Sequence, residues 1–105
     1  MSSNPAPRLD ASIDQDEVLR LVVQLGRESN PGLAERPAAG LDGELERDHG
    51  LDSLARMELL ARLERHFGVV LGEREMAEAR TPLDLCSVLA AAAAAGRTLA
   101  PGTGR

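Results

Sequence analysis

Two long segments of the chain carry apolar residues at intervals of three and four positions, the spacing of an amphipathic helix. In the first segment these residues are Val18, Leu21, Val22 and Leu25. We therefore predict a helix over residues 13–25, with Gly26 as its end. Ser12 and Gln15 lie three positions apart, as in a capping box, and mark its start.

The clearest helical pattern spans residues 53–67 and stops at Gly68. One face of this second helix is apolar and consists of Leu59, Leu60, Leu63 and Phe67. A second, mixed face consists of Leu54, Met57, Glu58, Ala61 and Arg65. The apolar face predicts burial in a core, whereas the mixed face predicts contact with solvent or a partner.

The other segments complete an all-α prediction. Residues 27–51 lack sustained periodicity and are interrupted by prolines and glycines, which indicates a long first loop. The residues expected to attach this loop to the core are Leu33, Leu41 and Leu45. Residues 73–79 suffice for one short helix. Thr81 as cap and Pro82 as first residue begin a last helix, which Gly96 ends.

The expected fold is a small four-helix bundle, with three main helices, one short helix and a long first loop. Residues 1–11 are interpreted as a disordered leader, residues 12–96 as the folded domain and residues 97–105 as a flexible tail. The leader has no apolar run, so we expect no secretory signal. The last helix should bury Leu85, Val88, Leu89 and Ala92.

Composition narrows the class of protein. Phe67 is the one aromatic residue, so the core must be aliphatic, which favours packed helices over a β-sandwich. The formal net charge of −5 argues against a nucleic-acid partner, because phosphate neutralisation requires Lys and Arg. The apolar run over residues 88–95 is much shorter than the roughly 20 residues of a membrane helix. We expect a cytoplasmic monomer that binds neither nucleic acid nor membranes.

The single cysteine, Cys86, excludes an internal disulfide and a multi-cysteine zinc site. It lies in an apolar helical stretch, which predicts a buried and inert thiol. The sequence therefore predicts no functional role for the cysteine thiol.

The candidate functional residue is Ser53, at the junction between the long loop and the second helix. Segment 42–52 before it holds five acidic residues and one arginine, either as a solvated loop or as a docking rim. A structural alternative is that Asp52 or Ser53 only caps the helix. However, Arg56 stands where a capping box led by Ser53 would need Glu or Gln, and two cap-type residues in a row leave one side chain spare.

A serine hydrolase is the enzymatic alternative. It would need a base within hydrogen-bond reach of Ser53, an orienting acid and an oxyanion hole. His49 and His66 are the two histidines, and Asp52 and Leu54 flank Ser53 without the second glycine of a nucleophile elbow. The sequence therefore favours a protein that is not an enzyme.

The residues Gly50-Leu51-Asp52-Ser53-Leu54, followed by an amphipathic helix with Glu58, resemble the acyl carrier protein family. The segment from Leu63 to Val69 and the later Thr81-Pro82-Leu83-Asp84-Leu85 extend the resemblance to about residues 12–96. It implies a non-catalytic carrier with 4'-phosphopantetheine attached covalently to Ser53, which would hold acyl groups as thioesters. Asp52 would assist the magnesium used during attachment, and the mixed face of the second helix would bind partners.

The implied partners are a phosphopantetheinyl transferase, an acyl-activating ligase or acyltransferase, and downstream synthase enzymes. The implied pathways are polyketide, lipid or lipopeptide biosynthesis. Arg56, Arg62 and Arg65 make the second helix less acidic than in fatty-acid carriers, which favours a specialised pathway. His49 replaces a usual apolar residue, so a packing role and pH sensing stay open. A peptidyl carrier and an unmodified interaction module of the same fold are the alternatives.

Overall fold

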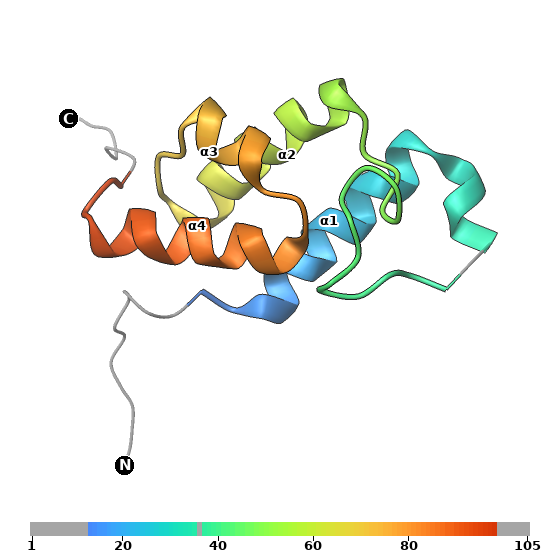
Figure 1. Ribbon diagram of the computed structural model, residues 1–105, viewed down its shortest axis with the longest axis horizontal. Helices are drawn as coiled ribbons and strands as arrows, with labels where there is room; N and C mark the ends of the chain where they lie inside the picture. Colours follow the sequence, from blue (N-terminus) through green and yellow to red (C-terminus); the bar gives the residue numbers. More distant parts are fainter. Residues whose placement is uncertain (1–12, 36, 99–105) are drawn as a thin grey trace, which may run out of the picture.

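The structure, a computed structural model, describes residues 13–35 and 37–98, and Figure 1 shows their arrangement. Its elements are α1 (Gln15–Ser29), the 3-10 turn η1 (Pro31–Glu35), α2 (Ser53–Phe67), α3 (Glu73–Glu78) and α4 (Pro82–Ala94). Within these described ranges no strand is present beyond an isolated antiparallel bridge between Val69 and Thr98. The predicted all-α bundle of three main helices and one short helix is confirmed.

Helix α1 differs from its prediction at both ends. Asp14 is the N-cap, because its Oδ1 accepts a hydrogen bond of 2.9 Å from the Asp16 amide. The predicted cap, Ser12, lies outside the described residues. Gly26 does not end the helix but is buried within it, and the Asn30 amide closes the last turn on the Gly26 carbonyl at 2.8 Å. Pro31 follows, and a residue before proline is disfavoured in helical conformation.

Helix α2 has the predicted bounds. Its C-cap, Gly68, has a φ of 69°, a left-handed conformation that a glycine adopts without steric cost. The Glu64 carboxylate then accepts from the Leu71 amide at 2.8 Å and supports the turn toward α3. Local capping therefore ends this helix where the sequence indicated.

Helices α3 and α4 also follow the prediction closely. Thr81 and Asp84 form a reciprocal capping box at the start of α4, with Pro82 as the first helical residue. The predicted tail begins with two residues that contact the bundle: Arg97 forms an ion pair with Glu75 at 2.8 Å, and Thr98 pairs with Val69. These two contacts are long-range, so a local pattern does not contain them.

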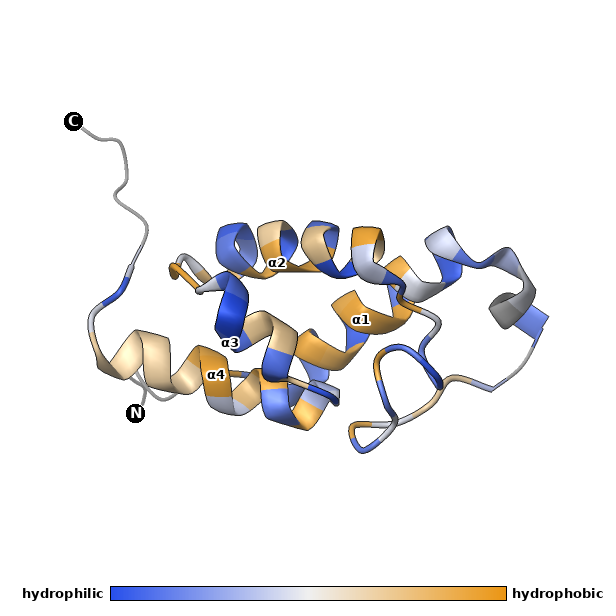
Figure 2. Cartoon of the chain, turned by 45° about the horizontal axis from the view of Figure 1, so that its top comes forward, coloured by the Kyte–Doolittle hydropathy of each residue, from blue (hydrophilic) through white to orange (hydrophobic). Residues whose placement is uncertain are grey.

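The core is aliphatic, as predicted, and lies between α1, α2 and α4. Its fully buried members include Val18, Val22, Leu45, Leu51, Leu59, Leu63, Leu85 and Leu89. Leu60 and Ala92 are also buried, while Phe67 and Val88 are partly buried against the cluster. Figure 2 shows that α4 is largely apolar, whereas α3 begins with strongly hydrophilic residues.

The loop between η1 and α2 is held by backbone hydrogen bonds to the start of α4. The Leu45 amide donates to the Arg80 carbonyl at 2.8 Å, and the Leu83 amide donates to the Leu41 carbonyl at 3.1 Å. Leu45 is fully buried and Leu41 is partly buried, as expected. The loop doubles back along α1 before it reaches α2 (Figure 1).

The helices that the structure describes are all too short or too polar to span a lipid bilayer.

Candidate functional site

The loop-to-helix junction places Ser53 at the surface. Gly50 has a φ of 74°, a conformation that favours glycine, and it turns the chain so that Leu51 is fully buried. Asp52 follows as the N-cap of α2, and its Oδ1 accepts from the Ala55 amide at 2.8 Å. Ser53 is then the first helical residue, and it is exposed.

Of the two candidate caps, Asp52 is therefore the residue that caps α2. Over residues 13–35 and 37–98, no hydrogen bond to the Ser53 side chain is found. The amides of Ser53 and Leu54 lie in the first helical turn, where backbone donors have no helical acceptor. The positive end of the helix dipole also favours a negative charge there. These features fit a phosphate ester on Ser53.

The mixed face of α2 is exposed, as the periodicity predicted. The exposed fraction is 79% for Leu54 and 49% for Met57, two large apolar side chains that lie next to the serine. Glu58 and Arg65 are exposed, and Ala61 is half-buried. Arg65 lies twelve residues after Ser53, which corresponds to about 18 Å along a helix. Leu54, Met57 and Glu58 are thus grouped near the serine, whereas Arg65 lies at the far end of α2.

Two of the three arginines of α2 have structural partners. Arg62 donates to Glu58 on the same helix at 3.0 Å and to Glu28 of α1 at 2.8 Å. The Arg56 guanidinium is directed at backbone carbonyls at the end of α3. Arg65 is the one of the three that is exposed. The arginines therefore change the charge of the docking face less than their number suggests.

A hollow of about 390 Å³ lies between the end of α1 and the start of α2, where Asp52 and Leu54 line it but Ser53 does not. Its lining residues are Leu25, Glu28, Ser29, Asp52, Leu54, Ala55, Glu58 and Arg62. The hydrogen bond from Arg62 holds the pKa of the Glu28 carboxyl below its ordinary value. Sequence reasoning did not find the contribution of α1, because no local pattern relates Glu28 to a helix that begins 25 residues later.

The acidic segment before Ser53 is only partly balanced by arginines. Glu44 lies 3.6 Å from Arg47 and 3.5 Å from Arg80, and Asp48 lies 3.6 Å from Arg47. Asp48 also accepts from the Glu44 amide at 2.7 Å and stabilises the turn. Asp42 and Glu46 are exposed, so this side of the junction presents negative charge to solvent.

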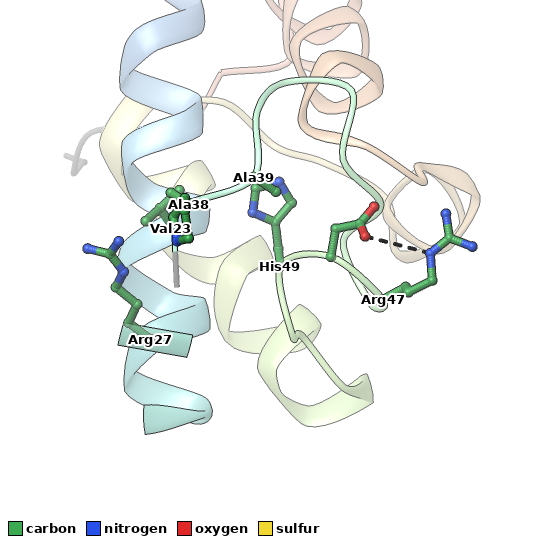
Figure 3. Close-up of a pocket in the computed structure, with 8 residues that line it drawn as sticks. Val23, Arg27, Ala38, Ala39, Arg47 and His49 are labelled. Carbon is green, nitrogen blue, oxygen red and sulfur yellow. Dashed lines mark ion pairs between the residues drawn. The ribbon is translucent and has the colours of Figure 1, made fainter. Parts of the chain in front are cut away.

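His49 has a packing role. Only 3% of the residue is exposed, and its Nε2 lies 3.0 Å from the Gly40 carbonyl oxygen. It lines a cavity of about 310 Å³ between α1 and the loop, where Arg27 and Arg47 extend on opposite sides (Figure 3). Ser53 is not among the residues that line this cavity.

Neither histidine is arranged as a catalytic base for Ser53. The His49 ring is bonded to the Gly40 carbonyl, and His66 lies 3.1 Å from Glu17 of α1. A nucleophilic serine needs its base within hydrogen-bond distance. The hydrolase alternative thus has no support in the geometry.

The remaining candidate groups are structural. Cys86 is buried on α4, as predicted, and its burial raises the pKa of the thiol, which disfavours the reactive thiolate. In the part of the chain that the structure describes, no group of three or more His, Cys, Asp or Glu side chains could hold a metal ion. Asp52 is therefore a single carboxylate, and metal binding there would need ligands from other molecules.

Comparison with known proteins agrees with this geometry. Residues 31–89, more than half of the chain, match the family described as "Phosphopantetheine attachment site". The chain is 43% identical over 58 residues to the anthracycline acyl carrier protein DpsG of Streptomyces peucetius. It has the same identity over the same length to the anthracycline acyl carrier protein DauA of Streptomyces sp. (strain C5).

The aligned region covers 55% of this chain and 63% of each relative, less than two thirds of their length. No solved structure matches the chain significantly. The family match includes the η1 turn, the loop, the Ser53 junction and the helices through most of α4. The chain belongs to the phosphopantetheine attachment-site family, whose covalent prosthetic group is 4'-phosphopantetheine.

Proposed function

We propose that the chain is an acyl carrier protein of polyketide biosynthesis and that Ser53 is its attachment residue. One observation at the junction carries this proposal. Asp52 caps α2, whereas the neighbouring Ser53 hydroxyl is exposed and has no hydrogen-bond partner among the described residues. The two relatives, both named as anthracycline acyl carrier proteins, support the polyketide assignment.

The chemistry at Ser53 is a group transfer catalysed by a partner transferase. The Ser53 Oγ attacks the phosphorus of coenzyme A that bears the pantetheine arm, and a new Oγ–P bond forms. The bond from that phosphorus to the adenosine bisphosphate breaks, and the hydroxyl proton passes to a base of the transferase or to water. The first-turn amides of α2 and its dipole stabilise the resulting phosphodiester. When bound, the group supplies a thiol that carries acyl chains as thioesters.

Asp52 has two roles in this proposal. One oxygen, Oδ1, caps α2 and holds the junction in place. Within the transferase complex, the carboxylate also helps to hold the magnesium ion that the coenzyme A pyrophosphate requires. The exposed position of Asp52 beside Ser53 supports this second role.

Leu54, Met57 and Glu58 form the proposed docking face next to the serine, with Ala61 and Arg65 farther along α2. Exposed apolar side chains beside charged ones suit transient binding, because charges speed encounter and apolar contacts hold the complex briefly. The proposed partners are the transferase, a loading ligase or acyltransferase, and synthase enzymes of the cytoplasm. The carrier itself presents cargo and does not catalyse a reaction.

An intact-mass measurement tests the proposal. The purified chain is incubated with coenzyme A, magnesium and a broad-specificity phosphopantetheinyl transferase. We expect the mass to rise by one phosphopantetheine group in the wild type and to stay unchanged in Ser53→Ala.

Ser29→Ala is the matched control. Ser29 is also exposed but lies at the C-terminal end of α1, where the helix dipole disfavours a phosphate. It should be modified like the wild type. A folded wild-type chain that gains no mass would instead support an unmodified interaction module.

A further inference from the structure

Arg56 extends from the first turns of α2 and caps a different helix. Its Nη2 donates to the carbonyl oxygens of Met76 at 2.9 Å, Ala77 at 3.2 Å and Ala79 at 2.8 Å. These carbonyls lie at the C-terminal end of α3, where backbone acceptors have no partner within the helix. A cation there also complements the helix dipole. Arg56 therefore serves as the C-terminal cap of α3, although it lies about twenty residues earlier in the chain.

Helix α3 depends on such contacts for its position. It has six residues, far fewer than an isolated helix needs for stability, and Met76 is its buried anchor. At its N-terminal end, the Glu75 carboxylate accepts from the Gly72 amide at 2.9 Å. At its C-terminal end, the Arg56 guanidinium donates hydrogen bonds to the last carbonyls. Loss of that guanidinium should release the end of α3.

Arg56 also lies three residues after Ser53, so the two side chains project from the same side of α2. Helical side chains lean toward the N-terminus, so a long side chain at position 56 is able to reach the turn that contains Ser53. The guanidinium has five N–H donors, and the contacts to α3 use Nη2. The residue whose side chain caps α3 thus lies within one helical turn of the proposed attachment residue.

We propose that Arg56 couples the modification of Ser53 to the position of α3. In the unmodified chain the guanidinium caps α3, and after modification the phosphodiester on Ser53 draws it away. A phosphodiester bears a full negative charge and accepts two parallel N–H bonds from arginine, whereas a carbonyl offers only a dipole. The inference rests on the proposed function, since it requires the phosphodiester at Ser53.

The consequence is that α3 should unfold locally more often in the modified carrier than in the unmodified one. Once Arg56 turns to the phosphodiester, the carbonyls of Met76 and Ala79, two residues that are otherwise buried, must find water instead. Partner enzymes that contact α3 would then distinguish a modified carrier from an unmodified one. This makes Arg56 a positioning residue, which acts through α3.

Amide hydrogen exchange of α3 tests the coupling on the intact chain. Unmodified and fully modified wild type are compared, with complete modification confirmed by mass. A hydrogen bond to a charged group contributes enough net stability to change an opening equilibrium by at least about tenfold. We therefore expect about tenfold faster exchange over residues 73–79 in the modified form.

Two variants isolate the role of the guanidinium. In Arg56→Met, α3 should exchange fast in both forms, so that modification adds nothing. Arg27→Met removes an exposed arginine from the last turn of α1, outside the proposed docking face, and should leave the difference between the two forms as in the wild type. Circular dichroism checks that each variant is folded.

The outcomes separate the coupling from the attachment itself. A full mass gain with equal or slower exchange of α3 would overturn the coupling and leave Ser53 as the attachment residue. A chain that gains no mass would overturn both. A persistent difference between the two forms of Arg56→Met would show that another residue responds to the phosphodiester.

Discussion

Leu63 and Met57 lie six residues apart on the same helix, and they differ completely in environment. Leu63 is 0% exposed in the core, whereas Met57 is 49% exposed beside Ser53. The buried face of α2 packs against α1, belongs to the common core and sets the stability of the bundle. The exposed face contributes little to stability and is available to partners. The comparison shows that one helix can serve as scaffold and docking surface because its two faces are energetically separate.

The largest effect is expected on the buried face. Leu63→Ala removes a fully buried side chain and should lower the free energy of unfolding by about 2–5 kcal/mol, through lost burial and a residual cavity. Thermal or urea unfolding measures this loss. An unchanged unfolding midpoint would mean that the buried face does not support the bundle, and the comparison would fail.

Met57→Glu should impair loading by a partner enzyme and leave the stability almost unchanged, the opposite of Leu63→Ala. We expect loading by a cognate enzyme to fall about tenfold, in line with the loss of one apolar anchor worth more than 1 kcal/mol at an interface. Stability should change by no more than about 0.5 kcal/mol, as at most surface positions. Loading kinetics and thermal unfolding measure the two effects.

Leu83→Glu is the matched control for Met57→Glu. Leu83 is 45% exposed on α4, so the same charge enters at a similarly exposed apolar position away from α2. Loading of this control should equal that of the wild type. Equal losses in both variants would show that added negative charge alone impairs loading and that the exposed face of α2 is not specific.

A smaller effect is expected at Asp52, which caps α2 and which we propose to assist the transfer reaction. Asp52→Asn keeps an N-cap of equal quality, so the stability should change by only about 0.5 kcal/mol or less. The rate of phosphopantetheine transfer should nevertheless fall several-fold, because the carboxylate that we propose to assist magnesium is lost. The initial rate of the mass gain, measured at several magnesium concentrations, checks this. A variant as fast as the wild type would limit Asp52 to capping.

The smallest effect is expected where α1 meets the edge of α2. Arg62 lowers the pKa of the Glu28 carboxyl from its ordinary value of 4.5, so the pair stabilises the fold only while Glu28 is ionised. Wild type should be slightly more thermostable than Glu28→Gln at neutral pH. This advantage should shrink as the pH falls below 4.5 through the folded-state pKa. Melting curves over that range measure it, and an advantage that grows on acidification would contradict the pairing.

The two glycines Gly26 and Gly68 illustrate how far a local pattern reaches. Gly68 ends α2 because the chain takes a left-handed conformation there. Gly26 was predicted to end α1 in the same way, but the helix continues to Ser29 and stops ahead of Pro31. Glycine permits a helix end without requiring one, whereas proline restricts the residue before it. The Asn30-Pro31 pair was the signal that would have placed this boundary correctly.

The candidate site likewise has features that a local sequence pattern locates and features that it does not. Asp52, Ser53 and the exposed face of α2 could be located from the sequence, because capping and helical periodicity act within a few residues. The contacts of Arg56 with α3 and of Arg62 with Glu28 could not. Their partners lie about twenty or more residues away, and similar side chains would pair elsewhere in a different packing.

By itself, the sequence determined the all-α class, the bounds of α2, the start of α4 and the exposed serine at a helix start. Each of these depends on apolar spacing or on a cap within one turn. Only the tertiary structure decided that the end of α1 lines a hollow with Asp52 and Leu54, that Thr98 pairs with Val69 and that Arg56 caps α3. The physical reason is that local signals select a helix and its ends, whereas the packing of helices decides which distant polar groups meet.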